Sequence, residues 1–279
     1  MWRSTAGNSL QIPFIKAHGA RNDFLLTWTD QAPSAVFDPA VIARAICDRH
    51  SGVGADGWIL VTGDPGSGAD GAIELWNSDG SRGEISGNGT RCAAALLVDA
   101  GLAQDEVRVA TGAGVKRLRL LARDRGRFSF EMNMGVAAIE DLRSTLTPGR
   151  ECVVLNVGNP QCAVFVEDFE FDWRTLGAQL ESHPRFPNRT NVSFVRVLDA
   201  HTLEARFYER GAGETMSSGT GCTGAAVAAQ ARGWVQDPVR VLTPAGPLDL
   251  RRQGEDLVLA GPAEIVAAGD FYYDLEQDG

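Results

Sequence analysis

The chain has 279 residues, 44% of them hydrophobic and 22% charged, and 36 acidic against 26 basic residues give a net charge of −10. This composition is typical of a soluble globular protein, its length leaves room for two domains, and the negative charge argues against a nucleic acid or an anionic membrane as partner. A substrate carboxylate would have to be held by local groups, because no general positive field is available.

Residue patterns in the first half predict short strands around two helices, the second of which follows a glycine-rich loop. The helix at 38–50 opens with an aspartate cap and a proline, and its apolar residues recur at helical spacing. In chain order we expect a strand, the turn "HGARND" and a strand within 12–28, this helix, strands at 57–63 and 71–77, a helix from 86 to 100, and strands at 107–111, 115–122 and 127–135.

The second half repeats this order of elements. We expect two strands around a Gly-Asn-Pro turn within 151–168, a helix at 172–184, strands at 191–199 and 202–211, a helix from 218 to about 232, and strands at 239–246, 248–252 and 256–273. Each half is mostly strands with one long helix after a glycine-rich loop, which indicates an α+β protein built from a duplicated unit. We predict domains at 1–131 and 132–264, with the segment 265–279 packing back on the first.

The duplication is visible as a repeated motif. The stretches "SGNGTRCAAALL" (86–97) and "SGTGCTGAAVAA" (218–229) share the pattern S-G-x-G-x-x-x-A-A. A polar residue at the end of a predicted strand, Asn77 or Glu209, stands nine positions before each serine. The matched order therefore predicts two equivalent polar sites.

A glycine-rich loop entering a helix exposes backbone N–H groups, and the helix dipole adds positive charge there. Two such termini could grip one substrate carboxylate from both sides and stabilise the charge formed when its α-carbon loses a proton. Acid/base groups on opposite faces of that carbon would invert a stereocentre. The pattern also fits two plain N-caps with close helix packing.

The sequence contains no motif for a metal or a nucleotide cofactor. "GVGADG" (52–57) fits G-x-G-x-x-G but follows a helix rather than a strand, which argues against a dinucleotide site. No Walker-type Gly-Lys-Ser/Thr and no G-x-S-x-G context of a catalytic triad is present. The histidines lie in separate elements without metal-ligand spacing: His18, His50, His183 and His201.

The cysteines favour a reducing compartment. Five are present without a C-x-x-C pair, namely Cys47, Cys92, Cys152, Cys162 and Cys222. An odd number of isolated cysteines fits reduced thiols that are buried as small hydrophobic side chains. No stretch approaches the roughly 18 apolar residues of a membrane span, and the opening residues lack a signal-peptide pattern. We therefore expect a cytoplasmic protein.

Six blocks stand in order along the chain: "FIKAHGARNDFLLT", "CDRHSGVGADG", "NSDGSRGEISGNGTRC", "LNVGNPQC", "ESHPRFPNRTNVSFV" and "YERGAGETMSSGTGC". Over residues 13 to 275 they resemble the diaminopimelate epimerase family, and the last block is the most specific. The resemblance implies two similar domains, each a mostly antiparallel sheet wrapped around a central helix, related by a pseudo-two-fold axis with the active site between them. It also implies a cofactor-free interconversion of LL- and meso-diaminopimelate for lysine and peptidoglycan precursors, and suggests a homodimer.

The site residues follow from the resemblance by motif. Ser86 and Ser218 hold the two catalytic positions, and Glu209 is a third candidate for proton transfer. Arg210 suits a bidentate clamp on the distal carboxylate. The other pocket side chains would be Asn22, Asn77, Asn159, Gln161 and Asn191, and the backbone donors would be Gly87, Asn88, Gly89, Gly219, Thr220 and Gly221. Turn chemistry would explain Asn22 and Asn159 equally well.

The chain departs from the family at the reacting groups. The family has cysteines where this chain has Ser86 and Ser218, and one cysteine acts as thiolate base and the other as thiol acid. A helix N-terminus can tune a thiol from a pKa of about 8.5 toward neutrality, whereas an alcohol titrates far above that range. The family's histidine after Gly-Asn-Pro is Gln161 here. Arg21 stands where the family usually has glycine, and Gly57 replaces a common polar pocket residue.

Three functions remain open on the sequence. One is diaminopimelate epimerase with another proton relay, through Glu209 or through waters held by Asn77 and Gln161. A second is another isomerase, racemase or dehydratase acting on an amino acid, and a third is a catalytically weak amino-acid-binding homologue. Cys92 and Cys222 lie inside the two long helices, and we expect them to point into the packing rather than to replace the missing thiols.

Overall fold

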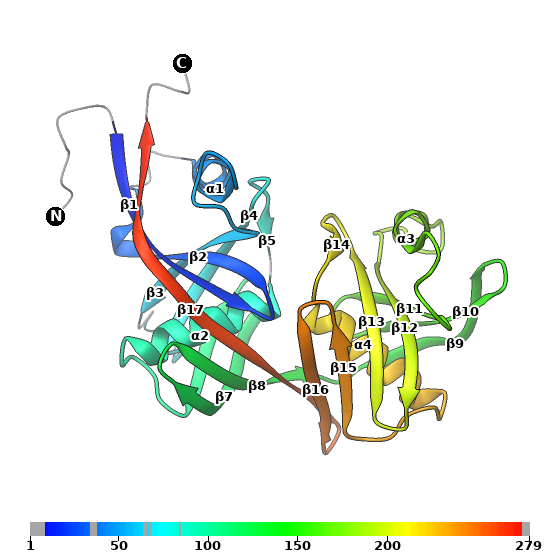
Figure 1. Cartoon of the computed structure of the whole chain (residues 1–279). Coiled ribbons are helices and arrows are strands. Elements are labelled where there is room, and N and C mark those ends of the chain that lie inside the picture. The colour runs from blue at the N-terminus through cyan, green and yellow to red at the C-terminus, as the bar shows by residue number, and fades with distance from the viewer. Residues whose placement is uncertain (1–8, 34–37, 64–65, 67, 84, 275–279) are drawn as a thin grey trace. The chain divides into compact units, whose positions relative to one another are not determined.

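The computed structural model describes residues 9–33, 38–63, 66, 68–83 and 85–274 (Figure 1). The chain divides into two compact units: unit 1 comprises Met1–Phe130 and Pro262–Gly279, and unit 2 comprises Glu131–Gly261. The chain passes from one unit to the other inside two strands, β8 (Arg127–Gly135) and β17 (Asp256–Asp274).

Unit 1 is a mainly antiparallel sheet with two α-helices. Its elements are β1 (Ser9–Gly19), β2 (Asn22–Trp28), the 3-10 turn η1 (Thr29–Gln31), α1 (Pro39–Cys47), β3 (Gly57–Gly63), β4 (Gly71–Asn77), β5 (Arg82–Gly83), α2 (Gly87–Asp99), β6 (Glu106–Thr111) and β7 (Gly114–Asp124). The strands pair in the order β17-β1-β2-β3-β4-β6-β7, and the short β5 pairs with β4. The pairs β2–β3 and β4–β6 are parallel.

Unit 2 repeats this topology. Its elements are β9 (Ala138–Thr147), β10 (Arg150–Asn156), β11 (Pro160–Phe165), α3 (Trp173–Glu181), β12 (Asn191–Asp199), β13 (Thr202–Glu209), β14 (Gly213–Thr215), α4 (Gly219–Ala231), β15 (Val239–Thr243) and β16 (Gly246–Gln253). They pair in the order β9-β10-β11-β12-β13-β15-β16-β17, with β14 on β13, and the parallel pairs are β11–β12 and β13–β15. The parallel pairs fall at the same places as in unit 1, so the duplication seen in the motif extends to the strand order.

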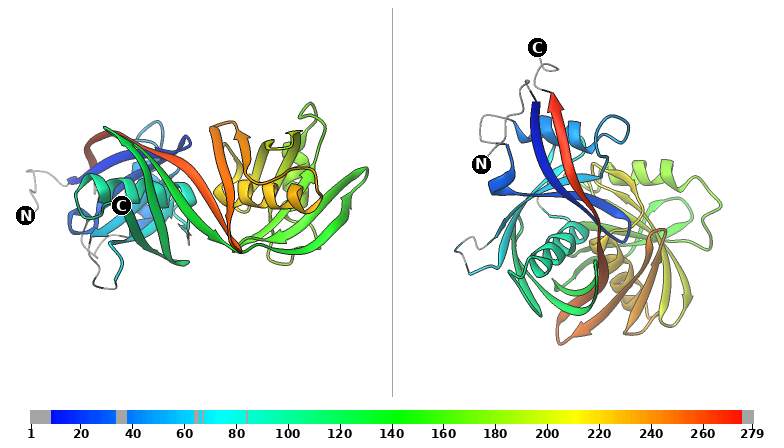
Figure 2. Two further views of the ribbon diagram at one scale, coloured as in Figure 1. Left: turned by 90° about the horizontal axis from the view of Figure 1, so that it is seen from below. Right: turned by 60° about the vertical axis from the view of Figure 1, so that its left-hand side comes forward.

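Each unit wraps its sheet around one buried helix, α2 in unit 1 and α4 in unit 2 (Figure 2). Every residue of α2 from Asn88 to Val98 is buried, and α4 is buried almost as completely. A helix surrounded by strands buries side chains on all of its sides, and most of them are therefore small or apolar. The small residues of the two alanine runs let the strands approach closely. The mixed α+β class predicted from the sequence is confirmed.

The β1–β2 hairpin closes over two residues in left-handed backbone conformation. Ala20 has φ of 49° and Arg21 has φ of 60°. Two-residue hairpin turns of this kind favour glycine and asparagine, because a Cβ is strained there. Gly19, directly before this turn, packs closely against the start of α2, since a Cβ added at Gly19 would lie 3.0 Å from the Cα of Asn88. The turn therefore lies beside the predicted site residue Asn88.

The predicted strands and helices are confirmed with local differences. The first predicted helix ends at Cys47 rather than at residue 50, because the Asp48 carboxylate accepts from the N–H groups of His50 and Ser51 at 2.9 and 2.6 Å and turns the chain. The strands β5, β9 and β14 were not predicted. Strand β9 buries only Ser144 and pairs with β10 in a shifting register, so it lacks the alternation that marks a strand.

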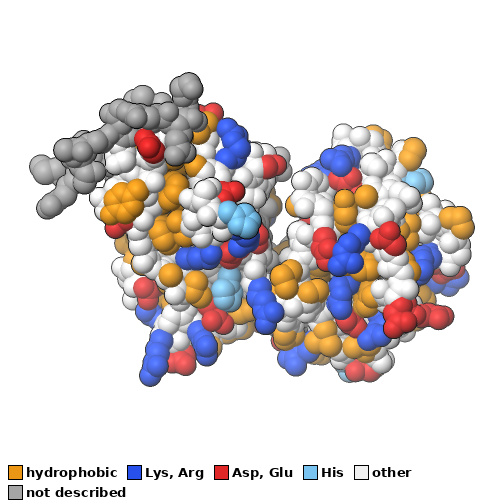
Figure 3. Space-filling model, turned by 45° about the horizontal axis from the view of Figure 1, so that its top comes forward, with side chains coloured by type: hydrophobic (Ala, Val, Ile, Leu, Met, Phe, Trp, Pro, Cys, Tyr) orange, Lys and Arg blue, Asp and Glu red, His pale blue; other side chains and the backbone are white. Residues whose placement is uncertain are grey.

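The surface and core agree with the composition. On the face of each unit that Figure 3 shows, basic and acidic side chains are interspersed rather than gathered by sign. All five cysteines are buried and none is in a disulfide, as predicted. Cys92 and Cys222 are 0% exposed within α2 and α4, which confirms their packing role. Within the described residues, no helix is long and apolar enough to cross a membrane.

Candidate active site

The predicted site residues fall into two groups, one in each unit. We call Ser86, Asn22, Asn77, Gly87, Asn88 and Gly89 half-site 1. We call Ser218, Glu209, Asn159, Gln161, Asn191, Arg210, Gly219, Thr220 and Gly221 half-site 2. Both groups lie at the N-terminal end of the central helix of their unit and at the adjacent strand ends.

Ser86 and Ser218 are the N-caps of α2 and α4. Their backbones are extended, with φ and ψ of −128° and 123° at Ser86 and −136° and 124° at Ser218. Each Oγ accepts the N–H of the glycine three residues on, Gly89 or Gly221, at 3.1 Å. The capping alternative is therefore realised at both positions. It leaves the N–H groups of the two preceding helical residues without an acceptor inside the helix.

The two capping glycines have a steric reason as well. A Cβ on Gly89 would lie 2.9 Å from Ile59 Cδ1, and one on Gly221 would lie 2.7 Å from Phe207 Cδ1. The second glycine of each Gly-x-Gly thus lets the helix N-terminus press against a strand of its own unit. This contact fixes where the helix N–H groups point.

Half-site 2 contains a serine–carboxylate pair. Glu209 is the last residue of β13, and its Oε1 accepts the hydroxyl of Ser218 at 2.6 Å. Burial raises the pKa of Glu209 above the ordinary value of a glutamic acid, although the hydrogen bond from Ser218 opposes that shift. A desolvated carboxylate of raised pKa is a stronger base than an exposed one, which suits it to proton abstraction.

Half-site 1 lacks the corresponding pair among the described residues. Asn77 ends β4 at the place that Glu209 holds in β13, but its Nδ2 donates to Ser81 Oγ at 2.9 Å and its side chain is exposed. Ser86, which is half-buried, makes its one side-chain hydrogen bond in the described structure with Gly89. The equivalent spacing in the sequence therefore does not produce equivalent chemistry.

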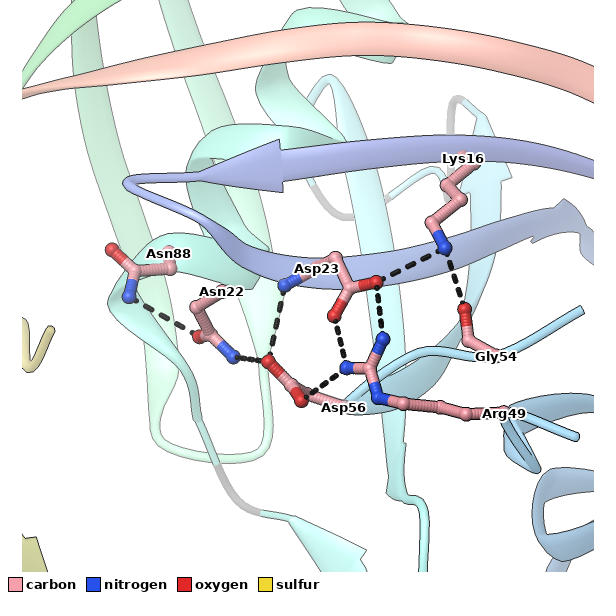
Figure 4. A network of polar contacts seen from close by, with 7 residues as sticks. All are labelled: Lys16, Asn22, Asp23, Arg49, Gly54, Asp56 and Asn88. Carbon is pink, nitrogen blue, oxygen red and sulfur yellow. Dashed lines mark hydrogen bonds and ion pairs between the residues drawn. The ribbon is translucent and has the colours of Figure 1, made fainter. Parts of the chain in front are cut away.

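Asn22 and Asn88 of half-site 1 belong to one hydrogen-bonded series (Figure 4). Asn88 Nδ2 donates to Asn22 Oδ1 at 3.1 Å, and Asn22 Nδ2 donates to Asp56 Oδ2 at 2.7 Å. Asp56 also accepts from Arg49 at 2.8 Å. At the other end, Arg91 donates to Asn88 Oδ1 from a fully buried position. The structure thus brings Asn22 and Asn88 together.

Half-site 2 has its own amide series. Gln161 Nε2 donates to Asn159 Oδ1 at 2.7 Å, and Asn159 Nδ2 donates to Thr220 Oγ1 at 3.3 Å, in the first turn of α4. Gln161 is 1% exposed, and its Oε1 makes no hydrogen bond within the described part of the chain. That buried oxygen lies beside the second turn of α4, 3.6 Å from where a Cβ added at Gly224 would stand.

Asn191 and Arg210 are held by the backbone around them. Asn191 Nδ2 donates to Pro160 O at 3.0 Å, and its Oδ1 accepts the N–H of Arg210 at the same distance. Glu181, 2% exposed, accepts the N–H of Gly211 at 3.2 Å. The guanidinium of Arg210 donates to Asn188 O at 3.3 Å on an exposed side chain. Asn191 and Glu181 therefore anchor the corner that presents Arg210.

An open hollow of about 900 Å³ in unit 2 is separate from these residues. Its lining includes Phe165 and Val195, which pair in the parallel strands β11 and β12. Gln161 and Asn191 pair four residues earlier on the same strands, which is roughly 13 Å at about 3.3 Å per residue. Across the described residues, no group of three His, Cys, Asp or Glu side chains is arranged to hold a metal ion.

Two functional candidates were missed in the sequence. Asp56 and Arg91 terminate the amide series of half-site 1, yet neither was singled out from the sequence. Asp56 lies in "GVGADG", which follows α1 as predicted, and the only functional pattern that this segment fits in the sequence is G-x-G-x-x-G. The burial of Arg91 has no signal in the sequence, because arginine is mostly exposed.

Family models match the chain to "Diaminopimelate epimerase" over residues 14–139 and 153–266. Among curated proteins, the diaminopimelate epimerase of Pelotomaculum thermopropionicum is 37% identical over 278 residues, which covers 93% of this chain and 99% of that protein. The diaminopimelate epimerase of Moorella thermoacetica is 38% identical over 284 residues, which covers 94% and 99% respectively.

Solved structures share the fold at low identity. A Bacillus anthracis phenazine biosynthesis protein of the PhzF family has a TM-score of 0.71 at 15% identity and covers 93% of this chain and 98% of its own. A hydroxyproline epimerase from Agrobacterium vitis has a TM-score of 0.70 at 16% identity, with coverage of 95% and 93%. At these identities the likeness indicates the fold alone.

Proposed function

The chain belongs to the diaminopimelate epimerase family, and we propose that it interconverts LL- and meso-diaminopimelate without a cofactor. The observation that carries this proposal is the hydrogen-bonded pair of Ser218 and Glu209 at the N-terminus of a buried helix. The pair joins a base of raised pKa to an anion-binding helix end, as removal of a proton beside a carboxylate requires.

We assign proton removal to half-site 2. The Glu209 carboxylate takes the α-proton, either directly or through the hydroxyl of Ser218, which already donates to it. The electron pair left on the α-carbon moves toward the substrate carboxylate. Backbone N–H groups at the helix start, such as those of Gly219 and Thr220, stabilise the negative charge that collects there.

We assign return of the proton to Ser86. Its oxygen is fixed by the N–H of Gly89 at 3.1 Å, which leaves its own O–H to donate outward. An alcohol can protonate a carbanion because the carbanion is the stronger base. Water then restores the proton on Ser86, and the hydroxide that this leaves takes up the proton that Glu209 removed from the substrate, so both groups return to their starting state. In either direction the reaction passes through the Ser86 alkoxide, and the high pKa of a serine hydroxyl makes that step slow.

The imbalance between the half-sites favours one alternative function. Of the two capping serines, only Ser218 has a carboxylate partner among the described residues, so a one-base isomerase or dehydratase acting on an amino acid would use Glu209 alone. On diaminopimelate, which has no β-hydroxyl to eliminate, such an enzyme would exchange the α-proton without inverting the carbon.

Incubation with LL-diaminopimelate in D₂O tests the proposal. We expect deuterium at the α-carbon together with the meso isomer, followed by mass spectrometry and chiral chromatography. Deuterium uptake with retained configuration would establish the one-base alternative in its place. Binding measured by calorimetry without any exchange would establish an amino-acid-binding protein.

We further place the chain in the cytoplasm, as a homodimer without nucleic acid or membrane partners. Five free, buried cysteines support a reducing compartment, and the family membership supports the dimer. Light scattering of the purified protein checks the oligomeric state. One chain has a mass of about 30 kDa, so a measured particle mass of that size would contradict the dimer.

A further inference from the structure

We propose that Asp56 and Arg91 are positioning residues that fix the hydrogen-bonding polarity of half-site 1, so that Asn22 and Asn88 present N–H donors to a substrate carboxylate. This inference rests on the proposed function, because it concerns the carboxylate beside the reacting carbon. Neither residue is assigned contact with the substrate.

The orientation of both amides follows from the chemistry of the two ends. A guanidinium has only donors, so the atom of Asn88 that faces Arg91 must be its oxygen. An ionised carboxylate has only acceptors, so the atom of Asn22 that faces Asp56 at 2.7 Å must be its nitrogen. The bond from Asn88 Nδ2 to Asn22 Oδ1 at 3.1 Å agrees with both ends.

The side-chain oxygens of Asn22 and Asn88 thus both accept a hydrogen bond from the protein. Each of the two amide nitrogens uses one of its two N–H groups in the series and retains the other. The neighbouring backbone groups at the start of α2 are also donors, because the first helical N–H groups have no intrahelical acceptor. Half-site 1 therefore presents donors from both side chains and backbone. Such a site favours a carboxylate over a carboxamide, whose NH₂ would meet N–H groups.

Both ends of the series are anchored in unit 1. Asp56 accepts from Arg49 at 2.8 Å and from the N–H of Asp23 at 3.2 Å, and Arg49 also donates to Asp23 at 2.7 Å (Figure 4). Arg91 also donates from Nε to Pro262 O at 3.1 Å. Neither end can turn without breaking a second hydrogen bond.

A series with two polar ends makes an unusual mutational prediction. Either end alone is sufficient to set the direction of both amides, because a reversed Asn22 would place two donors or two acceptors against each other. Asp56→Asn or Arg91→Gln alone should change the substrate preference by less than about threefold, whereas the double variant should change it by about tenfold or more.

The probe is LL-diaminopimelate with one of its two carboxylates converted to a primary carboxamide. In D₂O the full-length protein chooses between the two α-carbons of one molecule, so the ratio of deuterium at the two positions does not depend on the amount of folded enzyme. We expect the wild type to favour the α-carbon beside the carboxylate, and the double variant to shift the ratio toward the carboxamide end.

Asp70 provides the matched control. Like Asp56, it accepts a backbone N–H and an arginine, in this case both from Arg108 at 2.7 and 3.2 Å, and it lies outside the series. Asp70→Asn combined with Arg91→Gln should behave as Arg91→Gln alone. Arg91→Lys keeps a donor-only end, so Asp56→Asn combined with Arg91→Lys should give the ratio of Asp56→Asn alone and not that of Asp56→Asn combined with Arg91→Gln.

A second measurement needs no turnover. The side-chain NH₂ signal of Asn22, assigned by its loss in Asn22→Asp, should exchange slowly with solvent in the wild type and in both single variants. It should exchange faster in the double variant, where the series loses its direction. Unchanged exchange in the double variant would contradict the inference.

The outcomes separate the two proposals. Normal exchange at the α-carbon with additive effects of the two substitutions would overturn this inference and leave the proposed function standing. No α-exchange in the wild type would overturn the proposed function, and the Asn22 signal would still decide the role of Asp56 and Arg91.

Discussion

At the scale of single residues, Ser86 and Ser218 hold the same position in the repeat but differ in chemistry. Both cap a helix, and only Ser218 donates to a carboxylate in the described structure, at 2.6 Å. A serine hydroxyl is a far weaker acid than a thiol of pKa about 8.5. We therefore expect Glu209 to carry the acid/base chemistry and the two serines to limit the rate.

Replacing both serines by cysteine should raise the epimerisation rate. A thiol placed at each helix N-terminus supplies an acid/base group near neutral pH, which is worth about 10²-fold or more in kcat. The measurement is the rate of meso-diaminopimelate formation by the Ser86→Cys, Ser218→Cys double variant. Ser217→Cys, a change at a buried neighbour outside the cap, is the control. An unchanged rate in the double variant would mean that the rest of the pocket no longer supports the reaction.

Glu209→Gln should lower α-proton exchange by about 10²- to 10⁴-fold, because it removes the proposed base. The pKa of Glu209 is raised on folding, so the folded state binds more protons above the ordinary pKa of glutamate. The stabilisation from this group is full below that ordinary value and is lost as pH rises through the raised value. Thermal melting across this pH range should therefore show a steeper loss in the wild type than in Glu209→Gln, while exchange in the wild type rises with pH.

The sequence predicts the contacts of a site residue well where that residue bonds its close neighbours in the chain. The capping serines follow from the local motif, and the spacing from Ser218 pointed to Glu209. The same spacing failed at Asn77, because the turn to Ser81 takes its amide at 2.9 Å. The bond between Asp56 and Asn22 joins two turns distant in sequence, so no local pattern could reveal it.

At the scale of elements, the start of α4 depends on the absence of a side chain at Gly221. Gly221→Ala should destabilise the protein by about 1–3 kcal/mol, because its Cβ would lie 2.7 Å from Phe207 Cδ1. Gly224→Ala is the control on the same helix, since its Cβ would lie 3.3 Å from the flexible side chain of Gln161. Both changes gain the same helix propensity, so chemical denaturation of the two variants isolates the contact. Equal stability of the two would contradict the steric explanation.

The β1–β2 turn offers a stabilising change. Arg21 has φ of 60°, where a residue with a Cβ costs about 1–2 kcal/mol. Arg21→Gly should therefore raise the free energy of unfolding by about 0.5–1 kcal/mol after the entropy cost of glycine. Arg21→Ala keeps the Cβ and should give no gain in the same urea titration.

The elements predicted from the sequence were those with strong internal patterns. The two alanine-rich helices and the strands β3 and β4 combine clear periodicity with glycine boundaries, and their positions are confirmed. Strand β9 has mostly exposed residues and owes its conformation to pairing with β10. The extended conformation of such a strand depends on its pairing partner, and a single sequence does not show which segments pair.

At the scale of the whole molecule, unit 1 is built from two separate stretches of chain and unit 2 from one. Strand β1 pairs with β17 from Ser9–Asp274 to His18–Glu264. The duplicated strand order could be predicted from the repeated motif, whereas the extent of this pairing could not, because it joins the two ends of the sequence.

Ending the chain after Gly261 should destabilise unit 1 and spare unit 2. The truncation removes the partner strand of β1, which carries the fully buried Ile12 and would become an unpaired edge. Calorimetry should show one transition close to its original temperature and one lowered or lost. A chain ending after Asp274, which keeps all of β17, is the control. Loss of both transitions in the shorter chain would show that unit 2 depends on unit 1.

The split of unit 1 also sets an order of events during synthesis. Unit 2 is contiguous, so the ribosome delivers all of its strands before the last partner of β1 appears. At about 5–20 residues per second, β1 waits on the order of 10–50 s for β17. During that time its open edge is available to other nascent chains, so a chaperone that covers extended segments would act on the N-terminal strand of this protein rather than on its middle.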